Sequence, residues 1–263
     1  MGAEDQFPTS ERRSRILDML HADGRVRVTD LVRTLGVTDT SIRRDLACLE
    51  DEGKLRRIHG GAVAPPADPR AERFTEKQSL RLAEKRRIGA AAAEMVEQGD
   101  VLIVDSGTTT LQVAAAIPGT LRSGGMLTMV TNSLPLVDEL RTWPAPNLVL
   151  LGGYYLPDYQ ATVGPQAIEQ LSRISANKVF LGADGLTVAE GITTGHVLMA
   201  DVDRLMAERA RQVILTTDSS KLGRAGLARV IPIQKIHMLI TDRDAPADIV
   251  NALRAEGVEV RLV

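Results

Sequence analysis

Several residue types and patterns are scarce in this chain of 263 residues, and each scarcity excludes a class of protein. The single cysteine, Cys48, excludes an intrachain disulfide and any multi-cysteine metal site; we expect it to serve packing, with redox sensing as the alternative. Aromatic residues make up 3% of the chain and none lies between residues 10 and 63, which disfavours a stacking platform for single-stranded nucleic acid. No apolar run approaches the roughly 20 residues that span a bilayer, so no membrane partner is expected.

The net charge and the histidines of the whole chain also indicate no nucleic-acid or metal binding. The formal net charge is -2, so any binding of nucleic acid must come from a local basic patch. The four histidines are scattered without an i, i+4 pair, and we expect no metal site. The first six residues lack the basic start and apolar stretch of a signal peptide, which favours a cytoplasmic protein. The length and the 44% of hydrophobic residues allow one large or two modest domains.

The most informative stretch is residues 37–53, which predicts a short helix with two unlike faces. Ile42, Leu46 and Leu49 form one apolar stripe, and the helical period places Thr40, Arg43, Arg44 and Ala47 opposite. Arginine binds guanine O6 and N7 together, and a threonine methyl contacts thymine. A solvated helix face is the alternative, but the neighbouring segments favour a DNA recognition helix.

Those neighbouring segments complete a winged helix-turn-helix. An amphipathic helix over 10–23 ends at Gly24, and a second short helix, with Thr29 as its expected N-cap, ends at Gly36. Residues 54–63 predict a basic hairpin around Gly60 and Gly61, a wing for DNA phosphates, although the acids at 50–52 weaken its charge. The expected DNA contacts are Thr29, Thr38, Thr40, Ser41, Arg43, Arg44, Lys54, Arg56, Arg57 and His59.

The chain is expected to divide into a tail, two domains and a linker. Residues 1–9 form the tail, 10–64 the DNA-binding domain, 65–75 a proline-rich linker and 76–263 the second domain. Prolines at 65, 66 and 69 interrupt regular structure there. A charged helix is expected over 76–98, which either joins the domains, makes a dimer contact or caps the second core.

The second domain alternates short apolar runs with amphipathic segments. This alternation predicts a mostly parallel sheet covered by helices, and ligands of such sheets bind at the carboxyl ends of the strands. Strands are expected at 101–104, 127–130, 148–151, 179–181, 213–215, 238–240 and 258–263. Helices are expected at 109–117, 134–141, 166–172, 200–211 and 247–255.

Polar loops follow five of these strands, and the first has the pattern of an anion site. A glycine and hydroxyl-rich turn at 105–110 opens a helix, so backbone N–H groups and the helix dipole favour one compact phosphate; ordinary capping is the alternative, and Asp105 can instead orient the loop. Asp184 is expected to accept sugar hydroxyls and Lys221 to meet a phosphate. The expected effector contacts are Asp105, Ser106, Gly107, Thr108, Thr109, Thr110, Asn132, Gly152, Gly153, Asp184 and Lys221.

Motifs in both halves resemble those of the DeoR family of bacterial transcription regulators, in the same order over residues 10–263. The resemblance rests on the motifs Ser-Ile-Arg-Arg-Asp-Leu at 41–46, Ile-His-Gly-Gly-Ala at 58–62, Asp-Ser-Gly-Thr-Thr-Thr at 105–110, Gly-Ala-Asp-Gly at 182–185 and Asp-Ser-Ser-Lys at 218–221. The resemblance implies a sensor domain similar to ribose-5-phosphate isomerase and a sugar phosphate inducer of a repressor. It also implies a bacterial protein, a dimer or tetramer on duplex operator DNA, without a cofactor.

The chain departs from the family's pattern at two positions, and the departures bear on an enzymatic alternative. Met199 and Asp203 stand where the family commonly has Glu and Lys, which implies a different effector charge or size. A sugar-phosphate isomerase would need a positioned general base, and those enzymes pair two acids as Asp-Gly-Ala-Asp, whereas Leu181 replaces the first acid here. We therefore expect binding without turnover and no catalytic residues. A winged helix used only for protein contacts is disfavoured by the basic wing.

Overall fold

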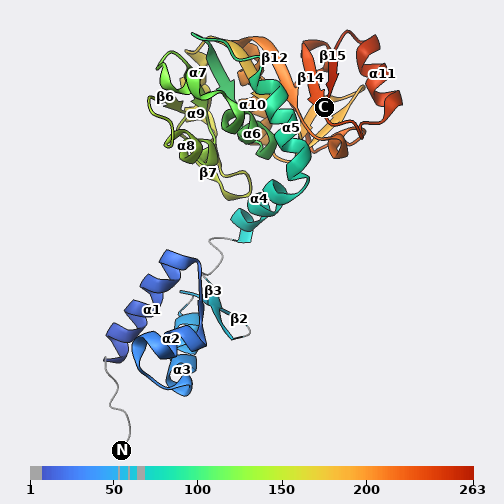
Figure 1. The fold of residues 1–263 in the computed structure, drawn as a ribbon. Helices are drawn as coiled ribbons and strands as arrows, with labels where there is room; N and C mark the ends of the chain where they lie inside the picture. Colours follow the sequence, from blue (N-terminus) through green and yellow to red (C-terminus); the bar gives the residue numbers. More distant parts are fainter. Residues whose placement is uncertain (1–7, 53, 59, 64–68) are drawn as a thin grey trace, which may run out of the picture. The chain divides into compact units, whose positions relative to one another are not determined.

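The computed structural model describes residues 8–52, 54–58, 60–63 and 69–263. The chain divides into two compact units, residues 1–69 and 70–263 (Figure 1). The first unit folds around a single cluster of buried apolar side chains. The second has two such clusters, one on each face of its main sheet.

The first unit is three helices and a small antiparallel sheet. The helices are α1 (Thr9–Asp23), α2 (Val28–Leu35) and α3 (Asp39–Asp51). The strands are β1 (Arg25–Arg27), β2 (Arg56–Ile58) and β3 (Gly61–Val63), in the order β1-β3-β2. The predicted helix-turn-helix and hairpin are confirmed, whereas β1, which extends the hairpin to three strands, was not predicted.

Local chemistry ends the helices of this unit where the sequence indicated. Gly24 and Gly36 adopt φ of 69° and 66° and donate their N–H groups to carbonyls of the preceding turn. Thr38 caps α3 by accepting from the Ser41 N–H at 3.3 Å. The expected capping by Thr29 is wrong: α2 begins at Val28, so its N-cap is Arg27, two residues earlier, and no side chain caps the helix.

The core of this unit contains an ion pair as well as the predicted apolar stripe of α3. Ile42, Leu46 and Leu49 are at most 1% exposed, and Asp45 lies among them, also 1% exposed. Its carboxylate accepts from Nε of Arg12 at 2.5 Å and Nε of Arg13 at 3.0 Å. Helix α1 is thus held to α3 by charge as well as by apolar contact.

The second unit is built on a seven-stranded parallel sheet with the order β15-β14-β12-β9-β4-β5-β6. Each strand falls on one of the seven predicted apolar runs, and every neighbouring pair is parallel, as expected. The strands are β4 (Val101–Val104), β5 (Thr128–Thr131), β6 (Asn147–Leu150), β9 (Ala176–Leu181), β12 (Ala210–Thr216), β14 (Met238–Thr241) and β15 (Glu259–Leu262).

Helices cover both faces of this sheet because successive strand residues point to opposite sides. Leu102 and Val104 belong to the buried apolar cluster on one face, and Ile103 belongs to the cluster on the other face. The five predicted helices of this region are confirmed, and the short α7 was not predicted. The helices are α5 (Leu82–Ala93), α6 (Thr108–Ala116), α7 (Gly119–Ser123), α8 (Leu134–Leu140), α9 (Pro165–Ser172), α10 (Val197–Arg209) and α11 (Ala247–Ala255).

Shorter elements fill the loops at the strand ends, and none of them was predicted. A hairpin of β7 (Tyr154–Leu156) and β8 (Ala161–Val163) follows β6. A three-stranded antiparallel sheet contains β10 (Gly185–Thr187), β11 (Gly191–Thr194) and β13 (Ala228–Arg229). The 3₁₀ turns are η1 (Pro157–Tyr159), η2 (Ser219–Lys221) and η3 (Ile233–Lys235).

The continuous helix expected over 76–98 is wrong, because the chain breaks at Arg81. Helix α4 (Pro69–Ser79) ends before it and α5 begins after it, and Arg81 itself adopts the left-handed φ of 52°. This conformation aims the Arg81 guanidinium at Asp242, 3.0 Å away, and Asp244, 3.1 Å away, so long-range ion pairs offset the local strain. Helix α5 caps the sheet core through the buried Ile88.

The linker expected at 65–75 is also shorter than predicted, because α4 already begins at Pro69. Proline suits the first position of a helix, where its missing N–H has no partner to lose. Residues 64–68 lie outside the described residues. Within the part of the chain that is described, no helix is long and apolar enough to cross a membrane.

Candidate functional site

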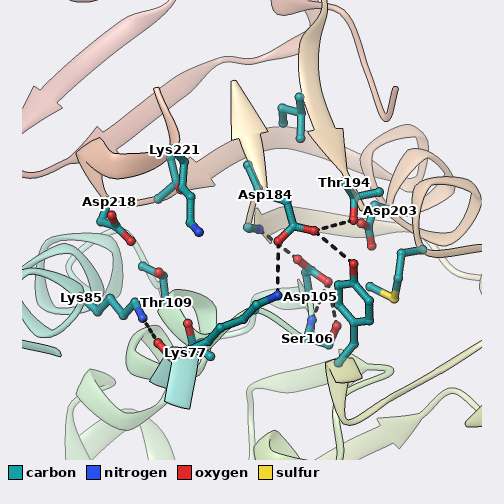
Figure 2. Close-up of a pocket in the computed structure, with 18 of the residues that line it drawn as sticks. Lys77, Lys85, Asp105, Ser106, Thr109, Asp184, Thr194, Asp203, Asp218 and Lys221 are labelled. Atoms are coloured by element: carbon teal, nitrogen blue, oxygen red, sulfur yellow. Dashed lines mark hydrogen bonds and ion pairs between the residues drawn. The ribbon is translucent and has the colours of Figure 1, made fainter. Parts of the chain in front are cut away.

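A cavity of about 320 Å³ lies at the carboxyl ends of the three adjacent strands β4, β9 and β12. Its walls come from the loops after these strands, from β11 and α10, and from the α4–α5 corner (Figure 2). This is the edge at which an open parallel sheet binds its ligands, and the volume suits a small metabolite.

The structure brings seven of the eleven predicted effector contacts together in this cavity. Five are consecutive in the loop after β4 and at the start of α6, and the other two lie after β9 and in η2. They are Asp105, Ser106, Gly107, Thr108, Thr109, Asp184 and Lys221. The prediction that these strand-end loops share one pocket is thereby supported for three of the five loops.

The other four predicted contacts lie outside the cavity, and each has a structural role instead. The Thr110 hydroxyl is buried and donates to the carbonyls of Asp105 and Gly107, 2.7 Å from each. The Asn132 amide donates to the carbonyl of Thr162, in the hairpin after β6. Gly152 donates its N–H to Gln170, and Gly153 passes so close to Val163 that a side chain would not fit.

Two buried carboxyl groups, Asp105 and Asp203, meet in the cavity wall (Figure 2). Asp105 accepts from the N–H of Gly182 at 3.0 Å and from the N–H of Ser106. Burial raises the pKa of Asp203 well above its ordinary value, and the charges of Asp105 and Asp184 raise it further. We infer that Asp203 holds a proton.

The raised pKa of Asp203 makes the second unit's stability depend on pH. Because the folded-state pKa lies above the unfolded one, the stabilisation is fully present below about pH 4, the ordinary aspartate range, and is lost as pH rises through the folded-state pKa. We expect Asp203→Asn, which donates a hydrogen bond without titrating, to flatten this decline and leave the unit more stable at neutral pH. Urea unfolding followed by Trp143 fluorescence across pH 4–9 measures it.

Asp201→Asn is the matched control, since Asp201 lies on the same helix but is exposed and paired with Arg204. Its unfolding curve should follow that of the unchanged protein at every pH. If stability against urea depends on pH in the same way in all three proteins, the inference that Asp203 holds a proton is wrong.

A third carboxylate, Asp184, is held by neutral donors and by one lysine. Its Oδ2 accepts from Tyr159 at 3.2 Å, from Thr194 at 3.0 Å and from the N–H of Gly195 at 2.9 Å. Its Oδ1 lies 3.8 Å from Nζ of Lys77. Burial opposes the charge of Asp184, but the Gly195 N–H, Lys77 and Thr194 outweigh it and lower the pKa, so this carboxylate is ionised.

Four cationic side chains line the cavity, of which sequence analysis named only Lys221. Lys77, Arg81 and Lys85 come from the α4–α5 corner, where the prediction of one straight helix gave no reason to single them out. Lys85 is 4% exposed and donates to the carbonyl of Lys77. Burial lowers its pKa, and the neighbouring cations Lys221, Lys77 and Arg81 lower it further against the attraction of Asp218. A bound anion would relieve this repulsion.

In the first unit, five of the residues predicted to meet DNA lie on α3 or at its N-cap. Thr40, Arg43 and Arg44 are exposed there, and the Arg43 guanidinium pairs with Asp39 one turn earlier. Thr38 and Ser41 are occupied with capping, and Thr29 is exposed on α2. His59 and the side chain of Arg56 lie outside what the structure describes.

The acids that precede the wing pair with its cations, in line with the expected weakening of the patch. Lys54 lies 2.7 Å from Glu52, and the Arg57 guanidinium lies 2.7 Å from Glu50. The N–H of Arg57 and then its guanidinium lower the pKa of Glu50, so this acid stays charged. Phosphates that approach the wing must compete with these acids.

A helix-turn-helix with a basic wing, in one chain with an α/β unit that holds a metabolite-sized cavity, is the architecture of a DNA-binding transcription regulator. The DeoR-like helix-turn-helix domain matches residues 12–67, and the DeoR C-terminal sensor domain matches residues 80–243. The chain therefore belongs to the DeoR family, whose members are transcription regulators rather than enzymes. Among the described residues, no group of three His, Cys, Asp or Glu side chains is placed to hold a metal ion.

Similar proteins match over nearly their whole length. The transcriptional regulator GlpR of Haloferax volcanii is 36% identical, over 95% of this chain and 96% of its own. The transcriptional repressor GlcR of Bacillus subtilis is 31% identical, over 95% of each chain. The regulator UlaR of Escherichia coli O127:H6 is 31% identical, over 97% of this chain and 99% of its own. A solved ribose 5-phosphate isomerase from Methanocaldococcus jannaschii is 16% identical with a TM-score of 0.38, over 52% of this chain and 53% of that one, which is too distant to carry an argument.

Proposed function

We propose that this protein is a repressor of sugar or polyol metabolism genes that leaves its operator when a phosphorylated sugar or related metabolite binds the cavity. The observation that carries the proposal is the meeting of the α6 N-terminus with the buried Lys85 and with Lys221 in one cavity. Helix N-termini and clustered cations both favour a phosphate. The names of the similar regulators, one of which is a repressor, support the same class of role.

Release from DNA follows from linkage between the two sites. A dimer or tetramer would place two recognition helices on the half-sites of a duplex operator. A ligand that favours an arrangement in which the recognition helices are wrongly spaced for the half-sites lowers the affinity for DNA. Bound DNA then lowers the affinity for the ligand by the same factor. Helix α4 supplies Phe74 and Lys77 to the cavity, so a bound ligand contacts the helix with which the second unit begins.

We also propose binding without turnover, in the bacterial cytoplasm, with the protein on the nucleoid when it is bound to DNA. An isomerase needs a carboxylate free to take a proton from carbon. Asp105 is committed to the N–H groups of Ser106 and Gly182, and Asp184 to three donors and Lys77. These carboxyl groups are arranged to hold a ligand, and no cofactor is proposed.

The experiment that tests the function measures binding to duplex DNA from the region upstream of the protein's own gene, at fixed salt, with and without a panel of sugar phosphates. Tight binding that one compound releases is expected and would identify the inducer. If no compound alters binding, the sensor half of the proposal fails. If no sequence-specific binding occurs, the DNA half fails, and the same panel is then assayed for turnover.

Arg43→Ala should weaken operator binding by roughly 1–3 kcal/mol if Arg43 reads a base. The fold should survive, because the pair with Asp39 is exposed to solvent and contributes little to stability. The measurement is the affinity for operator and for scrambled duplexes at one salt concentration. Arg141→Ala is the control, since Arg141 forms an exposed pair with Asp138 on α8. A loss that is equal on all sequences would show that Arg43 contacts only phosphate.

A further inference from the structure

The cavity carries charges of both signs: Lys85 and Lys221 share one side with Asp218, and a group of three carboxyl groups lies on the other side (Figure 2). Lys85 and Lys221 come from α5 and η2, and each lies within electrostatic range of the other. The carboxyl groups of Asp105, Asp184 and Asp203 interact with one another on the other side (Figure 2). The cations account for a phosphate, whereas three carboxyl groups are more than sugar hydroxyls need.

An ammonium already occupies the acidic side, and it belongs to the protein. Nζ of Lys77 lies 3.8 Å from Asp184 Oδ1 and 5.3 Å from the centre of the Tyr159 ring. The Tyr159 hydroxyl donates to the other oxygen of Asp184, and the edge of the ring contacts His196. A carboxylate and an aromatic face together form a corner that suits an ammonium. The Lys77 side chain is 46% exposed, so its pair is weak and displaceable.

Asp203 gives an independent sign that a hydrogen-bond donor is missing from this corner. Its side chain lines the cavity and is 6% exposed, yet its Oδ1 has no hydrogen-bond partner among the described residues. Buried polar atoms are almost always partnered in folded proteins. An ammonium beside Asp184 would bring a donor that also matches the charge of Asp184, whereas a hydroxyl would bring a donor alone.

We propose that the ligand of this cavity carries a protonated amino group as well as a phosphate, in the manner of an amino sugar phosphate, and that its ammonium takes the place of Lys77 Nζ beside Asp184 and Tyr159. The inference rests on the proposed function for the phosphate half of the cavity. It adds the amino group, which the acids of α10 and of the loop after β9 select. It also makes Lys77 a competitor of the ligand.

The test measures the binding of hexose 6-phosphates to the full-length protein by calorimetry. Three matched compounds are compared in the gluco series and three in the galacto series. The members of a series differ only at carbon 2, which bears an amino, a hydroxyl or an N-acetylamino group. The amino member should bind at least about tenfold tighter than either other member, which corresponds to about 1.4 kcal/mol. Lys77→Gln removes the competitor, so it should increase the ratio of the amino member's affinity to the hydroxyl member's affinity.

Lys235→Gln is the control, because Lys235 forms a similar exposed pair, 3.9 Å from Glu208, outside the cavity. Equal affinities within both series, tighter binding of a hydroxyl or N-acetyl member, or no binding of an amino member would overturn the inference. Thermal stabilisation of the protein by inorganic phosphate tests the phosphate half separately. If phosphate stabilises the protein but the amino group gives no advantage, this inference falls and the proposed function stands. If phosphate also has no effect, the proposed phosphate site falls with it.

Discussion

Asp45→Ala is expected to unfold the DNA-binding unit and to abolish operator binding, although Asp45 points away from the exposed face of α3. The substitution leaves the Arg12 guanidinium, which is 4% exposed, without the carboxylate 2.5 Å from its Nε. Removing one partner of a buried pair costs about 3–5 kcal/mol because the remaining buried charge loses the attraction that offset its desolvation. A unit of this size has little stability to lose, since small domains bury a small share of their surface.

The single tryptophan of the chain makes this outcome measurable in the intact protein. Trp143 lies in the second unit, so its fluorescence reports the unfolding of that unit alone, whereas far-ultraviolet circular dichroism reports both. In Asp45→Ala, part of the circular dichroism of the helices should be lost at low urea concentration. The unfolding transition reported by Trp143 fluorescence should stay at the same urea concentration as in the unchanged protein. Asp39→Ala is the control. Asp39 lies on α3 and pairs with an arginine, as Asp45 does, but its side chain is 56% exposed. If the two variants unfold alike, the pair does not hold the unit together.

The sequence was sufficient to predict the sheet because its five inner strands are largely buried on both faces, although the edge strands β6 and β15 are mostly exposed. Continuous apolar runs such as the one at 101–104 have no other place in a folded chain, and glycines at φ near 70°, such as Gly24, predicted where helices end. It was not sufficient to decide which strand-end loops share the cavity. That depends on strand order: β4, β9 and β12 are adjacent, whereas the loops with Asn132 and Gly152 follow β5 and β6 on the far side of β4.

The cationic residues of the cavity were missed for a different reason. No glycine or proline marks the break between α4 and α5, and local patterns predicted one helix through Arg81. The break depends on ion pairs to Asp242 and Asp244, about 160 positions further along, as the sequence separations of 161 and 163 show. Contacts of that range leave no periodic signal. Thr110 was misassigned because its hydroxyl, identical in type to its neighbours, turns inward to backbone carbonyls.

Thr108→Asp should abolish the response to ligand and leave operator binding intact. The residue is the first of α6 and lines the cavity, so a carboxylate there meets the same N–H groups and cations as the phosphate would. Two unit charges 4 Å apart in a partly buried site interact by about 4 kcal/mol, so we expect ligand affinity to fall by roughly 100-fold or more. The helix itself should be preserved, because an acid in the first turn favours it.

The matched control distinguishes blocking of the cavity from the general effect of a carboxylate at the start of a helix. Thr120 is the second residue of α7, is exposed, and lies outside the cavity, so Thr120→Asp places the same charge in the same local setting without meeting the ligand. Operator release is measured for both variants against the compound that releases the unchanged protein. Release should fail only in Thr108→Asp, which would then remain on DNA at any ligand concentration tested. Normal release in that variant would mean that the phosphate binds elsewhere, and the N-terminus of α6 would be left as an ordinary helix start.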